Sequence, residues 1–169
     1  MKNSKQLIAA LLCLALWILP FPAHAAESEP IRIAFVDSGV SLKHLDAAQV
    51  EPGENFVFPD RDTDDRISHG TAAAGIVLGS ASLGLPALCP QAVIVPLVCY
   101  DTYPSGVSAR GDGHVMAQAI RSAVDLYHCR IINISMGMTQ DDPELRAAVD
   151  YALAQGAILV SAVGNDNRT

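Results

Sequence analysis

The sequence predicts an α/β fold in which a parallel β-sheet lies between helices on both faces, giving three layers. Short apolar runs alternate along the chain with segments of helical periodicity, and this order of strand, helix and strand is typical of a parallel sheet. The runs contain few polar residues, as expected for strands buried on both faces. The length of 169 residues fits one domain.

The first 25 residues predict an export signal. Two lysines precede an apolar run at 7–19, and the small-residue pattern Ala-His-Ala ends at Ala25. The run is 13 residues long, which is shorter than the about 20 residues that a membrane-spanning helix needs. We therefore expect cleavage after Ala25 and a mature domain at 26–169, either secreted or periplasmic, with no membrane partner after cleavage.

The charge of the mature chain argues against nucleic acid as a partner. Loss of Lys2 and Lys5 with the signal leaves 9 basic residues against 18 acidic ones, a formal charge of −9. A chain with this balance repels the phosphate backbone.

The first half of the mature chain predicts two strands, an acidic loop and a helix. The apolar run at 31–36 ends in Asp37-Ser38-Gly39, as a buried strand does where it enters a polar loop. The polar segment at 51–68 is expected to be a surface loop around a short strand at Phe56-Val57-Phe58. From His69 to Leu78 the chain is apolar on every side, which predicts a helix inside the molecule with its first residues facing outward.

A second long strand is predicted at 92–98, followed by a helix at 113–129. Apolar residues collect on one face of that helix at helical spacing: Val115, Ala119, Ile120, Ala123, Val124 and Tyr127. His114 and His128 lie near its two ends, where we expect them to be solvated or to cap the helix.

The last part of the chain predicts a strand, a helix and a strand. After the strand at 130–135, Asp142 and Pro143 form the cap and first turn of a helix that stops at Gly156. The residues expected on its buried face are Leu145, Ala148, Val149, Ala152 and Leu153. The final strand, at 157–162, leads towards Asn165.

Four polar residues are expected to meet at one end of the sheet. In an open parallel sheet the ligand site lies beyond the carboxyl ends of the strands. Asp37, Ser135 and Asn165 follow strands, and His69 begins the outward-facing end of a helix. Each residue alone has an ordinary explanation as a turn, cap or packed polar group.

Four blocks of sequence resemble the signature blocks of the subtilisin-like serine proteases, the subtilases. They are Val36-Asp37-Ser38-Gly39-Val40, His69-Gly70-Thr71-Ala72-Ala73-Ala74-Gly75, Asn133-Ile134-Ser135-Met136-Gly137 and Ala162-Val163-Gly164-Asn165. The resemblance covers nearly all of residues 31–166, and the separation of 32 residues between the aspartate and the histidine also suits this family. It implies a subtilisin-like domain, incomplete at its C-terminal side, that hydrolyses protein or peptide substrates through an acyl-enzyme.

The resemblance also implies a role for each matching residue. Asp37 orients the imidazole of His69, which acts as general base and then general acid. Asn165 matches the asparagine that donates a hydrogen bond to the oxyanion. Ser135-Met136-Gly137 resembles the segment along which an extended peptide is bound. The family's Gly-Thr-Ser nucleophile lies beyond the asparagine block, so we expect it to be missing before Thr169 and the chain alone to be inactive.

No cofactor or metal is expected. Asp60, Asp62 and Asp64 share the alternate spacing that begins a calcium loop, so calcium stays possible. The motif is not clear, however, because Asp65 and Thr71 stand where such a loop needs glycine and glutamate.

The cysteines are expected to be structural. Removal of the signal leaves Cys89, Cys99 and Cys129, an odd set in an oxidising compartment. We expect Cys99 and Cys129 at opposite ends of their strands and too far apart to join, which leaves Cys89 with Cys129 as the least implausible pair.

Two other interpretations remain open. The chain could be an inactive remnant of a subtilase that binds peptides along Ser135-Met136-Gly137. It could also be a nucleotide-binding domain of doubly wound topology, which would need a glycine-rich loop after the first strand. Ser38-Gly39-Val40-Ser41 offers one glycine there, which argues against that class.

Overall fold

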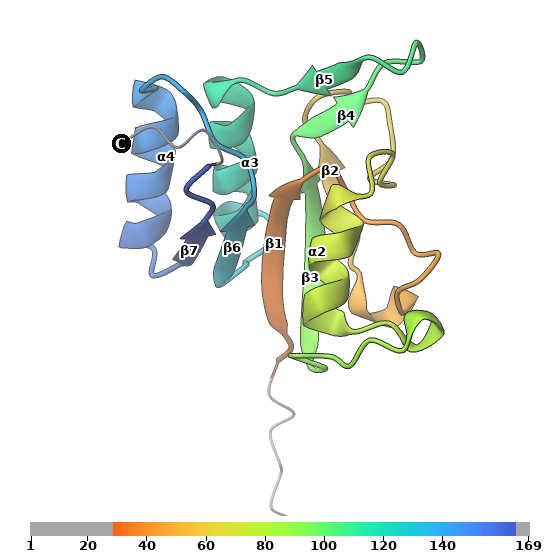
Figure 1. The fold of residues 1–169 in the computed structure, drawn as a ribbon. Coiled ribbons are helices and arrows are strands. Elements are labelled where there is room, and N and C mark those ends of the chain that lie inside the picture. The colour runs from red at the N-terminus through yellow and green to blue at the C-terminus, as the bar shows by residue number, and fades with distance from the viewer. Residues whose placement is uncertain (1–28, 165–169) are drawn as a thin grey trace, which may run out of the picture.

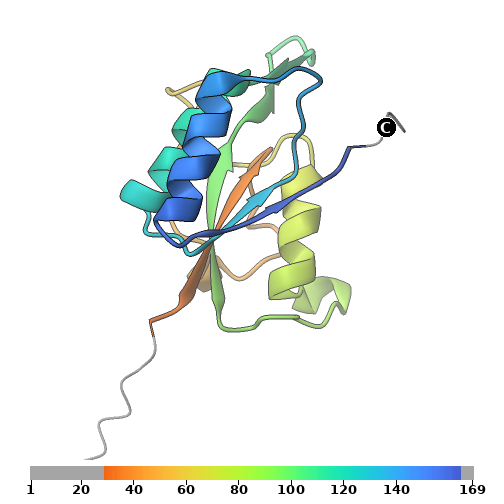
Figure 2. The same ribbon diagram turned by 90° about the vertical axis from the view of Figure 1, so that its left-hand side faces the viewer.

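A computed structural model describes residues 29–164 and shows a five-stranded sheet in the order β2-β3-β1-β6-β7 (Figure 1). Every neighbouring pair in this sheet is parallel. Helix α2 covers one face, and α3 and α4 cover the other (Figure 2). The predicted three-layer α/β architecture is confirmed.

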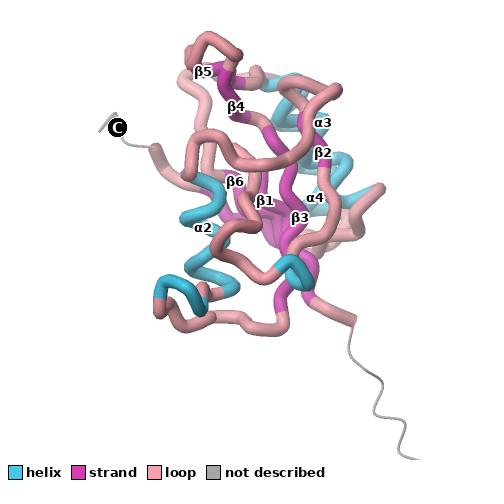
Figure 3. The backbone as a smooth tube through the Cα atoms, turned by 90° about the vertical axis from the view of Figure 1, so that its right-hand side faces the viewer, coloured by secondary structure: helices cyan, strands magenta, loops and turns pink. Residues whose placement is uncertain are grey.

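The elements agree with most of the predicted ones to within a few residues. The strands are β1 Ile31–Asp37, β2 Glu54–Asn55, β3 Ala92–Val98, β4 Tyr100–Thr102, β5 Ser108–Arg110, β6 Ile131–Ile134 and β7 Ile158–Ser161. The helices are α2 His69–Leu78, α3 Gly113–Asp125 and α4 Pro143–Ala154, with short 3-10 helices at Ala47–Gln49 and Ala81–Leu83. Figure 3 shows how much loop separates them.

The core lies on both faces of β1 and β3. All seven residues of β3 are buried, as the continuous apolar run predicts. Ile120 of α3 and Ile132 of β6 belong to the larger core cluster, and Ile94 of β3 belongs to the smaller cluster that packs against α2. Burying one such side chain stabilises the fold by about 1.5–3 kcal/mol.

The prediction of a short strand at Phe56-Val57-Phe58 is wrong, because β2 ends at Asn55. The Asn55 Oδ1 atom accepts hydrogen bonds from the backbone N–H groups of Val57, at 3.1 Å, and Phe58, at 2.8 Å. This side chain bends the backbone away from the sheet, which apolar patterning alone does not reveal.

Helix α2 is not buried on every side, contrary to the prediction. Ala74 and Leu78 face the sheet and are buried, whereas Ile76 is 61% exposed. Within residues 29–164, α2 is the one α-helix on its face of the sheet, so its outer side meets solvent. The prediction that its first residues face outward is confirmed, since the His69 side chain is 55% exposed.

The two other helices differ from the prediction at their ends. Helix α3 ends at Asp125, four residues early, and His128 adopts a left-handed conformation with φ of 51°. Asp142 caps α4 as predicted, accepting hydrogen bonds from the N–H groups of Glu144 and Leu145, both at 2.9 Å. Leu153, predicted to be buried, is 53% exposed.

The antiparallel pair β4–β5 was not predicted. Its turn runs from Tyr103 to Gly106, where the Gly106 N–H donates to the Tyr103 carbonyl at 2.8 Å. Gly106 has a φ of +81°, which glycine adopts at little cost. The hairpin lies at the same end of the sheet as the start of α2 (Figure 1).

The three cysteines within residues 29–164 are free, so Cys89 and Cys129 are not joined. Cys129 belongs to the larger core cluster, while Cys89 packs against the cluster under α2. Burial, followed by the charge of Asp37, raises the pKa of the Cys99 thiol to about 12, and burial raises that of Cys129 to about 12. These two thiols are therefore unreactive in the folded protein.

The predicted signal at 1–25 and the predicted oxyanion residue Asn165 lie outside the described residues. Between residues 29 and 164, the helices are too short or too polar for one of them to span a bilayer.

Candidate active site

The carboxyl end of β1 and the first residue of α2 meet at one end of the sheet. Asp37 is the last residue of β1, and its carbonyl accepts a hydrogen bond from Cys99 N–H, just beyond β3, at 2.9 Å. His69 is the first residue of α2, and its side chain contacts Asp37 at this end of the sheet. A separation of 32 residues in sequence thus becomes a direct contact.

Asp37 and His69 form a hydrogen-bonded pair. The distance from Asp37 Oδ1 to His69 Nδ1 is 2.7 Å. A carboxylate accepts hydrogen bonds, so Nδ1 carries the proton and the Nε2 atom of a neutral ring is free to take one. The Asp37 side chain is 1% exposed and that of His69 is 55% exposed, which leaves the far side of the ring open to a substrate or a hydroxyl.

The carboxylate of Asp37 also accepts a hydrogen bond from the backbone of the next residue. The N–H of Ser38 donates to Asp37 Oδ1 at 2.7 Å. The other oxygen, Oδ2, is buried and lacks a hydrogen-bond partner among the described residues. The Asp37 carboxylate is therefore held through Oδ1, which accepts from both Ser38 N–H and the His69 ring.

Gly70 allows α2 to approach β1 this closely. A Cβ atom at Gly70 would lie 2.2 Å from the carbonyl oxygen of Gly39 and 3.3 Å from the Oδ1 atom of Asp37. No side chain fits there unless one of the two segments moves.

Asp65 is a residue of this site that the sequence analysis missed. It was considered only as a position in a possible calcium loop, yet its carboxylate contacts both the loop after β1 and the start of α2. It accepts hydrogen bonds from the N–H groups of the residues two and three positions later, Ile67 and Ser68, at 2.9 and 2.8 Å. That local pattern is an Asx turn, a signal that the spacing could have offered.

The segment Ser135-Met136-Gly137 lies at the same end of the sheet, since it follows β6 beside β1. Ser135 N–H donates to the carbonyl of Val36 at 3.4 Å, and its Oγ accepts from Asn133 Nδ2 at 2.9 Å. Met136 is buried and Gly137 is exposed. The structure therefore brings Asp37, His69 and this segment to one end of the sheet.

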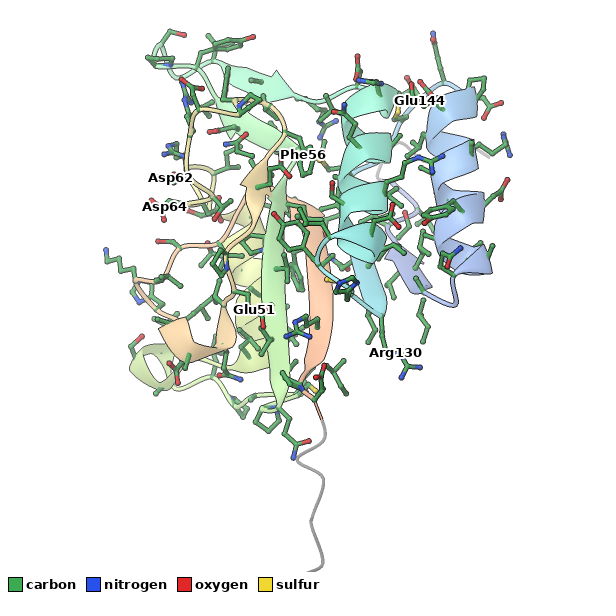
Figure 4. All side chains as sticks on the ribbon, turned by 180° about the vertical axis from the view of Figure 1, so that it is seen from behind. Glu51, Phe56, Asp62, Asp64, Arg130 and Glu144 are labelled. Carbon is green, nitrogen blue, oxygen red and sulfur yellow. The ribbon has the colours of Figure 1, made fainter. Side chains whose placement is uncertain are left out.

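The acidic loop at 60–65 makes contacts within the protein. Arg66 Nη2 donates to Asp62 Oδ1 at 2.6 Å, and this hydrogen bond lowers the pKa of Asp62. Asp62 and Asp64 lie next to each other on the loop (Figure 4). Over the described part of the chain, no three side chains of the His, Cys, Asp or Glu types are grouped as a metal site.

Comparison with known proteins places this geometry in a family. The model of the subtilase family matches residues 28–169. Thermitase of Thermoactinomyces vulgaris is 33% identical over 147 residues, covering 85% of this chain and 50% of that protein. The major intracellular serine protease of Bacillus subtilis (strain 168) is 30% identical over 150 residues, covering 85% of this chain and 46% of that protein.

Solved structures agree with the sequence relatives. Sphericase superposes with a TM-score of 0.67 at 28% identity, covering 83% of this chain and 48% of that chain. The chain thus spans about half the length of the proteins that it matches. With the family model, the relatives and the Asp37–His69 pair in agreement, the chain belongs to the subtilase family.

Proposed function

We propose that this chain supplies the acid–base part and the oxyanion donor of a subtilisin-like serine endopeptidase, which cleaves peptide bonds through an acyl-enzyme. The observation that carries the proposal is the contact of 2.7 Å between a buried aspartate and an exposed histidine at the end of a parallel sheet. Membership of the subtilase family supports it. The signal at 1–25 supports export of the protein.

Asp37 and His69 act as one unit in the proposed mechanism. Asp37 accepts from Nδ1 and thereby fixes the tautomer in which Nε2 can remove a proton from an attacking hydroxyl. The protonated ring is then an imidazolium beside a buried carboxylate, which stabilises it. The same Nε2 proton passes to the leaving amine as the acyl-enzyme forms.

Two other segments complete the proposed site. Asn165 donates its side-chain amide to the oxygen that becomes negative when the carbonyl is attacked, an interaction worth about 3 kcal/mol in such sites. Within the described residues, the N–H of Ala162 donates to the carbonyl of Ile134 at 3.2 Å, so the chain continues beside the end of β6 as far as Ala162. The segment Ser135-Met136-Gly137, in which Gly137 is exposed, binds an extended peptide by main-chain hydrogen bonds.

The proposal places the nucleophilic serine outside residues 29–164. Within that range the ring of His69 hydrogen-bonds to Asp37 and to no serine hydroxyl. The relatives are about twice as long as the matched region, which leaves room for the serine in their remaining half. A polypeptide without that serine cannot form an acyl-enzyme, so residues 1–169 alone are expected to be inactive.

A fluorophosphonate probe, which reacts with activated serines, tests the proposal. The expected result is no labelling of residues 1–169 and labelling of the complete translated product of the gene, lost on Asp37→Asn. Labelling of residues 1–169 alone would contradict the placement of the nucleophile. Peptide binding by the complete product with neither labelling nor hydrolysis would favour the inactive, peptide-binding remnant.

A further inference from the structure

The Asp65 carboxylate connects the two segments that carry the acid and the imidazole. We propose that Asp65 is a positioning residue that holds His69 against Asp37, an inference that rests on the proposed function of that pair. Asp65 lies in the loop before α2 and does not itself hydrogen-bond to the His69 ring, whose partner is Asp37. It acts through the backbone on either side of His69.

Four of the contacts of Asp65 are made with residues on either side of His69, at the beginning of α2. Its Oδ1 atom accepts from the N–H groups of Ile67 and Ser68, the two residues before His69, at 2.9 and 2.8 Å. Its Oδ2 atom accepts from Thr71 N–H at 2.8 Å and from Thr71 Oγ1 at 2.6 Å. His69 therefore sits between two stretches of backbone that are attached to one carboxylate.

The same carboxylate reaches the loop that follows Asp37. Ser38 Oγ donates to Asp65 Oδ1 at 2.9 Å and accepts from Gly70 N–H at 3.0 Å. Thr71 Oγ1, which donates to Asp65, accepts in turn from Ser41 N–H at 2.9 Å. We call this set of contacts the Asp65 network. It joins Asp65 to Ser38 and Thr71, Ser38 to Gly70, and Thr71 to Ser41.

The start of α2 needs this external support. Ser68 stands at the N-cap position with a left-handed φ of 72°, and its side chain makes no capping hydrogen bond. Asp65 takes over the capping role, and its negative charge suits the positive end of the helix. Burial raises the pKa of Asp65, but the hydrogen bonds from Thr71, Ile67 and Ser38 outweigh it, so that the pKa of this carboxyl is lowered overall.

The effect on the reaction follows from the short contact that the network maintains. A displacement of about 1 Å in a catalytic group can reduce the rate about 100-fold. Without Asp65, the first turn of α2 loses its cap and the Ser38 hydroxyl loses the acceptor that orients it towards Gly70, so His69 is expected to move relative to Asp37. The proposed substrate-binding segment Ser135-Met136-Gly137, which follows β6, makes no hydrogen bond to Asp65, so the loss should appear in kcat and not in KM.

Proton NMR of the purified chain tests this inference directly. The proton shared by His69 Nδ1 and Asp37 should give a downfield signal, assigned by its disappearance in His69→Gln and Asp37→Asn. Asp65→Ala is expected to lose or broaden the signal by exchange with solvent. Asp65→Asn keeps an oxygen acceptor for Ser38, Ile67 and Ser68 and should retain a weakened signal. Asp64→Ala, the matched control that removes the neighbouring charge, should behave as the wild type.

The outcomes separate this inference from the proposed function. A wild-type chain without the downfield signal would contradict the Asp37–His69 pair itself. A signal that stays sharp in Asp65→Ala would overturn only the role of Asp65. Equal loss in Asp65→Asn and Asp65→Ala, together with wild-type signals in Ser38→Ala and Thr71→Val, would assign the effect to charge and would also overturn positioning.

Smaller changes keep the test decisive if Asp65→Ala does not fold. Ser38→Ala removes the bridge between Asp65 and Gly70, and Thr71→Val removes the hydroxyl between Asp65 and Ser41. Each variant should broaden the signal in part. Wild-type signals in both would overturn the inference.

In the complete gene product, Asp65→Ala is expected to lower kcat up to about 100-fold at unchanged KM. A raised KM at normal kcat would contradict the inference.

Discussion

The central strand β1 and the last strand β7 differ in how completely they are covered. β1 has β3 on one side and β6 on the other, and its last five residues are buried. Among residues 29–164, β7 pairs with β6 alone, and Ile158 and Val160 on β7 are 60% and 51% exposed. Asp37 thus lies on the central strand of the sheet, whereas β7 is an edge strand in the described part of the chain.

The comparison explains how the Asp37–His69 pair can form without the rest of the proposed site. The side chains of Asp37 and His69, and the Gly70 backbone beside them, make hydrogen bonds whose donors and acceptors lie within residues 37–71. The proposed oxyanion donor, Asn165, and the proposed nucleophile lie outside the described residues. We expect the two regions to differ in their contribution to the free energy of unfolding, as they differ in burial.

The largest effect is expected at the centre. Asp37→Asn in the complete gene product keeps the shape of the side chain but offers an amide N–H where His69 needs an acceptor. The wrong tautomer should lower kcat by about 10⁴-fold, as in other sites of this kind. Steady-state hydrolysis of a peptide substrate measures it, with Asp46→Asn, far along the loop, as the control. A loss below tenfold would show that Asp37 does not set the tautomer.

Core truncation should distinguish the centre from the edge. Ile94→Ala on β3 removes a side chain that is fully buried and should cost about 2–5 kcal/mol of unfolding free energy. Ile158→Ala on β7 removes one that is 60% exposed and should change stability by less than about 0.5 kcal/mol. Urea denaturation measures both. Equal losses would mean that β7 is covered in solution by something outside residues 29–164.

Two glycines of α2 should respond in opposite directions. Gly70→Ala places a Cβ 2.2 Å from the Gly39 carbonyl oxygen and should destabilise the protein by about 1–3 kcal/mol. Gly75→Ala meets only Leu45 Cδ2, at 4.0 Å, and should stabilise the helix by about 0.5–1 kcal/mol. Thermal unfolding compares them. A neutral Gly70→Ala would contradict the close approach of α2 to β1.

The smallest effect concerns an exposed pair between α3 and α4. The hydrogen bond to Glu144, then its charge, raises the pKa of His114. The folded-state value lies above the unfolded one, so the pair contributes stability below about pH 6.5 and loses it as the pH rises through the folded value. His114→Gln should remove this slope from the stability profile. An unchanged slope would mean that the contact does not persist in solution.

The sequence predicted the parts of the fold that depend on continuous apolar patterning. β1 and β3 followed from runs buried on both faces, and α4 from the cap Asp142 and Pro143. β2 was misplaced because a side chain of Asn55, and not a pattern, ends it. The exposure of Ile76 could not be read from the sequence, since it depends on how many helices share a face.

The sequence indicated two residues of the candidate site but not the contacts that hold them together. The family blocks indicated Asp37 and His69, and the structure brings them into contact. Asp65 was missed because its role depends on hydrogen bonds to Ser38 and Thr71, which local spacing does not reveal. Asn165 stays a prediction.

The tautomer of His69 tests the central claim most directly. Long-range proton–nitrogen correlation spectra of the 15N-histidine-labelled chain identify which ring nitrogen carries the proton when the ring is neutral. The contact with Asp37 predicts the proton on Nδ1 in the wild type and its transfer to Nε2 in Asp37→Asn. A wild-type ring protonated on Nε2 would contradict the acid–base pair on which the proposed protease mechanism depends.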